Sequence, residues 1–244
     1  RAGGLMLIAA AGLEHAQLVD AAGSLFRRLA LGDGPESETA RFQSSEIRDE
    51  QDLEQAHLAF AFPGVSSTDP DAVAAQVFAT PLGGGMSSRL FQEAREKRGL
   101  CYAIYAFSQS HRDAGVIGIY AGTGEDKAGE VTPLIAAEIE AMAKGTTDEE
   151  AARARAQLRA SLLMALESPG SRCERIAGHL FNFGRVLSTR EMTARVDAVD
   201  AAALRRFATK LLERGTPAMA SVGPVGRLET LDRFARRFGR ITAL

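Results

Sequence analysis

The other expected elements of the chain can be placed around the segment PLGGGMSSRLFQEAREKRGLCYAIYAF, residues 81–107. Its three consecutive glycines, residues 83–85, predict a loop that uses backbone conformations closed to other residues. The serines that follow, Ser87 and Ser88, are typical helix N-caps, and apolar residues then recur at helical spacing. Gly99 predicts the end of this helix, because glycine adopts the left-handed conformation of a helix C-terminus at little cost.

A strand is expected immediately after this helix. Residues 101–107, CYAIYAF, are aromatic and apolar and carry no charge. Arg95 in the helix and Tyr102 in the strand are seven residues apart, on either side of Gly99. A glycine loop, a short cationic helix and a strand that begins near a tyrosine together suggest part of a functional site.

The rest of the chain alternates between helices and strands. A polar turn at 111–115 joins the strand at 101–107 to a second strand at 116–122, which predicts an antiparallel hairpin. Residues 32–52 are polar and contain glycine, proline and serine, so we interpret them as a linker. Further strands are expected at 5–11, 58–62 and 218–223, and helices at 14–29, 69–79, 127–144, 147–167, 172–183, 188–196, 201–212 and 228–238.

The composition is that of an ordinary globular protein of 244 residues, enough for one large domain or for one domain and a fragment. The net charge of −2 predicts no basic surface for nucleic acid or anionic membranes. No apolar run reaches the roughly 18 residues that a membrane-spanning helix needs. Two distant cysteines, Cys101 and Cys173, argue against a disulfide framework and favour a reducing compartment. The location is left open, with the cytoplasm favoured.

The two ends of the chain are similar. Each contains a short apolar strand that ends in glycine, Gly12 or Gly223, and then an amphipathic helix. An internal duplication with a period of one domain would explain this. The chain also opens with Arg1 rather than methionine and passes straight into an apolar strand. We therefore expect residues 1–42 to be the end of a preceding, similar domain with its linker, residues 43–244 to form the next domain, and targeting signals to lie outside the chain.

Few residues outside the first segment suggest chemistry. The four histidines, His15, His57, His111 and His179, show none of the paired spacings of a zinc motif, so a structural or surface role is expected for each. No G-x-S-x-G motif is present, and both cysteines lie in apolar patterns typical of core residues. The triple glycine lacks the G-K-[ST] and G-x-G-x-x-G patterns, which favours a simple turn over a phosphate-binding loop.

Arg95 and Tyr102 allow two interpretations. A guanidinium group binds carbonyl and carboxylate oxygens, and a phenol can donate to a developing oxyanion. At the mouth of one cleft, the pair would suit an extended peptide and its tetrahedral intermediate. Spacing alone favours the alternative, a helix-surface arginine paired with Glu93 or Glu96 and a tyrosine that packs on the sheet.

The segment LGGGMSSRLFQEAREKRGLCYAI, residues 82–104, closely resembles the pitrilysin and mitochondrial-processing-peptidase family of zinc metallopeptidases. The resemblance extends to DLEQAHLAFAFPGVSSTDPD at 52–71, GIYAGT at 118–123 and ASLLMALESPGSRCERIAGHLFNFGRVLS at 160–188. The start of the chain, LMLIAAAGLEHAQLVDAAGSLFRRL at 5–29, is similar to the end of the family's N-terminal half. By this resemblance the chain is the C-terminal half of such a protein with a remnant of the domain before it.

The resemblance implies two homologous α+β domains, each an antiparallel sheet packed against helices, that close like a clamshell around a peptide. The N-terminal domain of such proteins carries the zinc motif H-x-x-E-H, whose glutamate activates water. The C-terminal domain contributes an arginine and a tyrosine, seven residues apart, that bind substrate and stabilise the transition state. These positions fall on Arg95 and Tyr102. The zinc motif is absent from this sequence, so zinc is expected outside the chain, and the chain alone is expected to be inactive.

The resemblance leaves two main functions open. In the first, the complete protein is a zinc endopeptidase of peptides or unfolded segments, and this chain is its substrate-binding half; the excess of arginine over lysine favours a bacterial source. In the second, it is a non-catalytic subunit or scaffold that pairs with a zinc-bearing partner; the presence of both Arg95 and Tyr102 favours the first. A third, more general hypothesis is that the chain is a peptide-binding module that needs no metal. The expected partners are a peptide and an N-terminal zinc-bearing domain or subunit, and the surface where that domain would pack is expected to favour homodimers.

Overall fold

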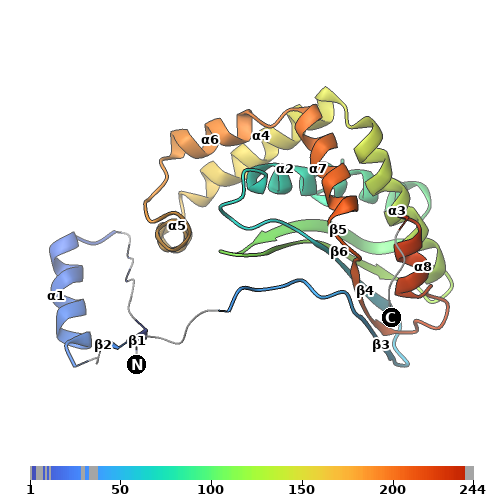
Figure 1. The fold of residues 1–244 in the computed structure, drawn as a ribbon, viewed down its shortest axis with the longest axis horizontal. Helices are drawn as coiled ribbons and strands as arrows, with labels where there is room; N and C mark the ends of the chain where they lie inside the picture. The colour runs from blue at the N-terminus through green and yellow to red at the C-terminus, as the bar shows by residue number, and fades with distance from the viewer. Residues whose placement is uncertain are drawn as a thin grey trace.

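The computed structural model describes residues 2–3, 8, 10, 12–28, 31–32 and 38–239. Its main body is a five-stranded sheet with a layer of helices on one face (Figure 1). Across the sheet the strands follow the order β3 (Glu46–Glu50), β7 (Ala218–Gly223), β4 (Ala56–Pro63), β6 (Gly115–Thr123) and β5 (Cys101–Ser110). Every neighbouring pair is antiparallel except β3 and β7. The α+β class and the predicted hairpin, now β5 and β6, are confirmed.

Several of the helices begin where a capping side chain accepts a hydrogen bond from a backbone amide of the first turn. Thr147 and Glu150 form a reciprocal capping box at the start of α4 (Asp148–Ala165), and Ser168, Ser188 and Asp200 cap the next three helices. The helices of the main body are α2 (Ala72–Gly83), the π-helix η1 (Phe91–Lys97), α3 (Ala128–Gly145), α4 (Asp148–Ala165), α5 (Pro169–Phe183), α6 (Thr189–Asp197), α7 (Ala201–Glu213) and α8 (Leu231–Arg236).

The core lies between the sheet and the helices. In β4, Leu58, Phe60 and Phe62 alternate with half-buried or exposed residues and are almost completely buried. The rings of Phe60 and Phe62 pack against Phe234 of α8, with centroid distances of 5.1 and 6.1 Å. Each such side chain contributes about 1.5–3 kcal/mol by its burial. The opposite side of each strand faces away from the helical layer, so the sheet presents one open face (Figure 1).

The N-terminal part of the chain contributes little to this core. Helix α1 (His15–Phe26) has no buried residue and lies apart from the sheet in Figure 1. The short strands β1 (Ala2–Gly3) and β2 (Leu31–Gly32) pair with each other rather than with the main sheet. The strand expected at 5–11 falls almost entirely outside the described residues. The boundary between 42 and 43 stays a prediction.

The interpretation of residues 32–52 as a linker is wrong for β3. This strand is polar and its Ile47 is exposed, so it lacks the apolar alternation by which strands are recognised. It forms because its backbone pairs with β7 from Glu46 to Glu50 at the edge of the sheet. An edge strand needs backbone partners on one side only and tolerates charged side chains.

The interpretation of residues 83–85 as a loop with left-handed backbone is also partly wrong. Gly83 is the last residue of α2, and Gly84 has a φ of −84°. A Cβ atom on Gly83 would lie 2.3 Å from the backbone nitrogen of Ala106 in β5. Glycine is therefore required at 83 because the end of α2 packs directly on the backbone of a strand, not because of a positive φ.

The predicted N-caps Ser87 and Ser88 do not cap the helix with their side chains. The Ser88 hydroxyl donates to the carbonyl of Gly85, and no side chain caps η1. Ser88 is buried, so this bond to the preceding loop satisfies a hydroxyl that water cannot reach.

Candidate functional site

Arg95 lies near the end of the π-helix η1. A π-helix has a wider turn than an α-helix, and such segments are rare and often found at functional sites. The helix ends as expected at Gly99, which has a φ of +58°. The amide of Gly99 donates to the carbonyl of Arg95 (3.1 Å), and the amide of Leu100 donates to the carbonyl of Ala94 (2.6 Å). This tight end turn leads directly from Arg95 into β5.

The guanidinium group of Arg95 is exposed and forms no ion pair within the described segments. Its central carbon lies 4.9 Å from the centre of the Phe91 ring, one turn earlier on the same helix. The nearby Glu93, considered above as a partner, pairs instead with Lys97 and Arg98. Arg95 thus has its orientation supported by a ring while its N–H donors remain available to a ligand.

Tyr102 lies at a β-bulge. Cys101 pairs with Thr123 and Ala103 pairs with Gly122, so Tyr102 is an extra residue with no partner on β6. As a result Tyr102 and Ala103 are both exposed, and the alternation resumes with buried Ile104. The Tyr102 side chain is 64% exposed, and its hydroxyl has no hydrogen-bond partner in the part of the chain that the structure describes. Bulges re-aim side chains and are over-represented beside active sites.

The two predicted site residues therefore flank one turn and share an unusual setting. A helix irregularity carries Arg95, a strand irregularity carries Tyr102, and both side chains present unpaired polar groups to solvent. This setting is compatible with ligand binding by both residues. Of the alternative interpretation, the surface position of Arg95 is observed, whereas its pairing with Glu93 or Glu96 is not found among the described residues.

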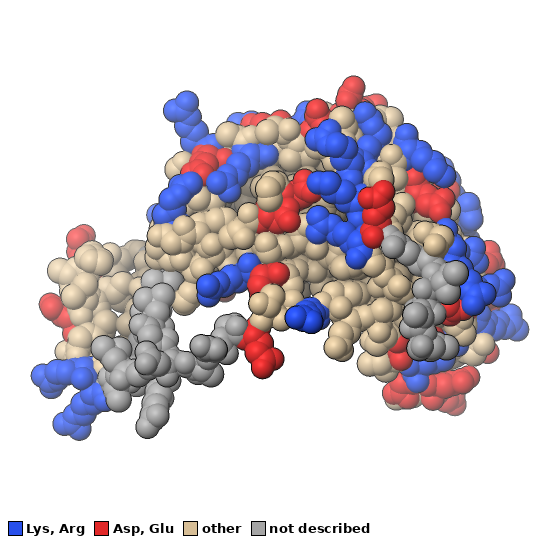
Figure 2. All heavy atoms as spheres, in the orientation of Figure 1, with Lys and Arg blue, Asp and Glu red and all other residues tan. Residues whose placement is uncertain are grey.

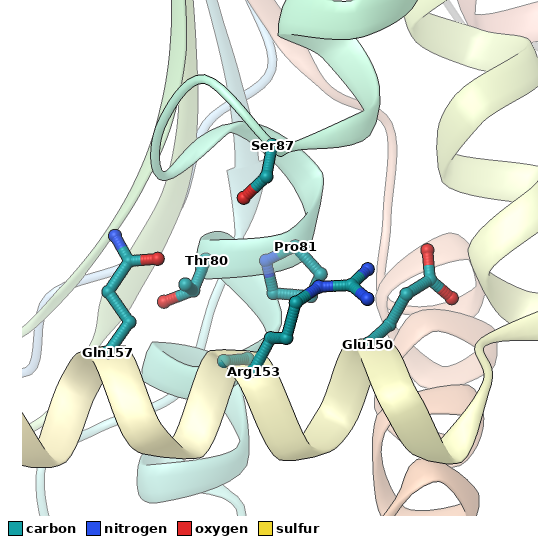
Figure 3. A pocket seen from close by; sticks show the side chains of 7 residues that line it. Thr80, Pro81, Ser87, Glu150, Arg153 and Gln157 are labelled. Carbon is teal, nitrogen blue, oxygen red and sulfur yellow. The ribbon is translucent and has the colours of Figure 1, made fainter.

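Helix α4 holds the loop that precedes η1. Arg89 makes a two-point ion pair with Glu150, with Nε and Nη2 at 2.6 and 2.9 Å from the carboxylate oxygens. Gln157 donates to the carbonyl of Gly84 (2.8 Å). In Figure 3 the side chains of Glu150, Arg153 and Gln157 project from α4 toward the end of α2 and Ser87, around a small polar pocket. The residues are about 60–70 positions apart, so local sequence patterns gave no sign of these contacts.

The ion pair changes the protonation behaviour of both groups. Burial is the largest single influence on Glu150 and opposes its ionisation, but hydrogen bonds from Arg89 and Thr147 together outweigh it and lower the pKa of the carboxyl. The hydrogen bond to Glu150 raises the pKa of Arg89. Glu150 therefore stays ionised at neutral pH and anchors the loop as a charged acceptor.

The histidines and cysteines do not form a zinc site among the described residues, where no group of three potential ligands is found. His57 Nδ1 lies 2.7 Å from the hydroxyl of Tyr120, and His179 Nδ1 accepts the backbone amide of Leu187. Burial raises the pKa of the Cys101 thiol to about 12, so this sulfur stays protonated. We therefore assign no metal ligand within the described segments.

The surface and the helices give two further observations. Basic and acidic side chains are interspersed over the helical layer on the face shown in Figure 2. Of the helices that the structure describes, none is long and apolar enough to cross a membrane.

Comparison with known proteins identifies relatives of two kinds. The family described as "Peptidase M16 inactive domain" matches residues 2–158. An uncharacterized zinc protease of Streptomyces coelicolor is 39% identical over 173 residues, covering 70% of this chain and 38% of that protein. A probable mitochondrial-processing peptidase subunit beta of Arabidopsis thaliana is 35% identical over 248 residues, covering 95% of this chain and 46% of that protein. The chain thus spans less than half of the length of either relative.

A solved structure shares the fold. A chain of complex III2 from Candida albicans superimposes with a TM-score of 0.83 at 22% sequence identity, covering 93% of this chain and 56% of that one. At this level of identity the similarity concerns the architecture alone.

Proposed function

The chain belongs to the peptidase M16 family, and we propose that it forms the C-terminal, substrate-binding half of a zinc-dependent endopeptidase acting on peptides or unfolded segments. The relatives named as zinc proteases and processing peptidase support this proposal. By itself the chain is proposed to bind substrate without cleaving it, because its sequence contains no H-x-x-E-H motif.

The observation that carries the proposal is the setting of Arg95 and Tyr102. Arg95 would donate to carbonyl oxygens of the bound peptide, and the Tyr102 hydroxyl would donate to the oxyanion of the tetrahedral intermediate. Zinc, bound outside this chain, would supply an activated water. The roles of the two side chains require exposed, unpartnered donors, which both of them have.

The test uses the complete protein, or this chain combined with its zinc-bearing half, and a quenched fluorescent peptide. We expect Arg95→Ala and Tyr102→Phe each to lower kcat/KM by about 10²–10³, the usual effect of removing one transition-state donor. Arg98→Ala is the matched control, because Arg98 follows on the same turn and already pairs with Glu93. Thermal midpoints should stay close to wild type, since both site residues are exposed. Wild-type turnover in both site variants would refute the assignment.

A second candidate is a non-catalytic subunit that pairs with a zinc-bearing partner. It is favoured by the relatives named as a subunit of the processing peptidase. Zinc content and the presence of an H-x-x-E-H motif in the complete polypeptide separate the two. Stoichiometric zinc with the motif supports the endopeptidase, and absence of both supports the subunit.

A further inference from the structure

The open face of the sheet carries a row of side chains that crosses all five strands. Strand pairing places Ile47 beside Ala220, Ala220 beside Ala59, Ala59 beside Tyr120 and Tyr120 beside Tyr105. The next row on the same face contains the residues Ala218, Ala61, Gly118 and Phe107. Small residues thus occupy the central strands β7 and β4, while larger side chains stand on either side.

These side chains enclose a hollow of about 360 Å³, which we term the aromatic hollow and define by Ile47, Ala59, Ala220, Tyr105, Tyr120 and Phe107. The alanines form its floor. The Tyr105 and Tyr120 rings stack at 5.0 Å between centroids and form its wall together with Phe107. None of the residues that line it carries a formal charge.

The walls of the aromatic hollow are held in place by the sheet itself. A Cβ atom on Gly118 would lie 2.2 Å from the Phe107 ring, so this glycine lets the ring lie against the backbone of β6. The Tyr120 hydroxyl bonds to His57, and burial with the neighbouring Tyr105 raises its pKa, so the phenol stays neutral. The hollow is therefore preorganised for an uncharged, bulky group.

The aromatic hollow and Tyr102 of the site proposed above are both reached from β5. The bulge places Tyr102 on the exposed side of β5, the side that also carries Tyr105 and Phe107. Tyr105 is three residues further along the strand, a distance of about 10 Å at the usual rise of a strand. An extended peptide advances by the same distance in about three residues. A peptide bond near Tyr102 would therefore bring a side chain about three residues away over the hollow.

We infer that the aromatic hollow binds a large apolar or aromatic side chain of the peptide, about three residues from the cleaved bond. This inference rests on the proposed function, because the distance of three residues is counted from a cleaved bond placed at Tyr102. The volume lies near the lower end of the roughly 300–1,000 Å³ of ligand pockets, which suits one or two side chains. A stable dimer would need about 800 Å² of surface per partner, far more than the hollow offers.

The test measures binding by the 244-residue chain, without cleavage. Labelled ten-residue peptides that differ only in one central Phe, Ala or Glu are titrated, and dissociation constants are taken from fluorescence anisotropy. We expect the Phe peptide to bind about tenfold more tightly than the Ala peptide, as for a buried aromatic anchor, and the Glu peptide to bind no better than Ala. Ala59→Leu, which fills the floor, and Tyr105→Ala should each remove the preference for Phe. Phe181→Ala on α5 is the control, because Phe181 is an exposed ring outside the hollow.

Two results would overturn the inference. Equal affinities for the Phe and Ala peptides would do so, as would sedimentation showing that the chain is a dimer and that Ala59→Leu makes it a monomer. Equal affinities together with turnover that still depends on Arg95 would refute the hollow and leave the proposed function standing. A preference for Phe together with wild-type turnover in Arg95→Ala would support the hollow and refute the proposed function.

Discussion

Replacing Gly83 by alanine is expected to destabilise the chain, although the same change strengthens most helices. Gly83 ends α2 where the helix meets β5. An added Cβ would lie 2.3 Å from the backbone nitrogen of Ala106 and 2.7 Å from its Cβ. The nitrogen belongs to a strand that pairs with β6, so no side-chain rotation can relieve the contact. The helix and the strand would have to move apart.

The expected size follows from two opposing effects. Alanine in place of glycine within a helix gains about 1 kcal/mol of stability. Insertion of a methyl group into a filled space costs about 1–3 kcal/mol, and a contact with backbone belongs at the upper end of that range. We therefore expect Gly83→Ala to lower the free energy of unfolding by about 1–2 kcal/mol.

The same substitution at Gly178 provides a matched control. Gly178 lies inside α5, and a Cβ added there would meet no atom within 4 Å. Gly178→Ala should therefore raise stability by up to about 1 kcal/mol. The chain contains no tryptophan, so urea unfolding is best followed by far-ultraviolet circular dichroism. With an m-value of about 2–3 kcal/mol/M, the two variants should differ in their urea midpoints by about 1 M.

Equal stability of Gly83→Ala and Gly178→Ala would contradict this prediction. Such a result would mean that α2 can move away from β5 without loss, and that the glycine is not required by close packing. A shifted circular dichroism spectrum of the folded Gly83→Ala protein would instead indicate a rearranged helix. The m-value should stay unchanged in both variants, because a change would signal altered compactness rather than altered stability.

Three further predictions concern groups in unusual surroundings. Glu150→Gln should lower the free energy of unfolding by about 2 kcal/mol at pH 7, the usual value of a charge-assisted hydrogen bond, whereas Glu149→Gln, at an exposed pair, should change it little. The pKa of Glu150 is lowered in the folded state, so its ionised form stabilises the fold above the usual glutamate pKa. This stabilisation is lost as the pH falls through the folded pKa, so the difference in urea midpoint between wild type and Glu150→Gln should shrink below about pH 4. A thiol reagent should label Cys173 in the folded chain and reach the buried Cys101 only on unfolding. Fast reaction of both thiols in the folded chain would show that Cys101 is not buried. Two guanidinium nitrogens of Arg175 are buried without a hydrogen-bond partner among the described residues. Arg175→Met should therefore leave the urea midpoint unchanged or raise it. A clearly lower urea midpoint would show that these nitrogens do have partners.

Local sequence patterns correctly predict those elements that depend only on neighbouring residues. The β5–β6 hairpin and the helix end at Gly99 each depend on a few neighbouring residues, and both predictions are confirmed. β3 could not be predicted in this way. It is polar, and its strand conformation depends on pairing with β7, whose residues lie some 170 positions later in the chain.

The candidate site also combines features that the sequence indicates with features that only the three-dimensional fold reveals. Resemblance to the family identifies Arg95 and Tyr102 as site residues, whereas their spacing alone favours a surface arginine and a packing tyrosine. The features that set them apart are the π-helix and the bulge, and neither has a residue signature in a single sequence. The loop contacts of Arg89 and Gln157 depend on the packing of α4 against α2, which becomes known only with the fold. The role of the pair in binding stays a prediction until it is measured.

The position of β7 in the sheet determines the order in which a newly synthesised chain can complete its fold. β3 and β4 are joined by only the short connection 51–55, yet β7 lies between them. On the ribosome, β4, β5 and β6 can pair once residue 123 has emerged. The other edge of β4 has no partner strand until β7, which ends at residue 223, has been synthesised. During that interval the apolar edge strand β4 is exposed to other chains, and β3 has no partner. A chaperone that binds extended apolar segments would therefore find its target at β4, and translation that stops before Gly223 would release a chain prone to aggregate.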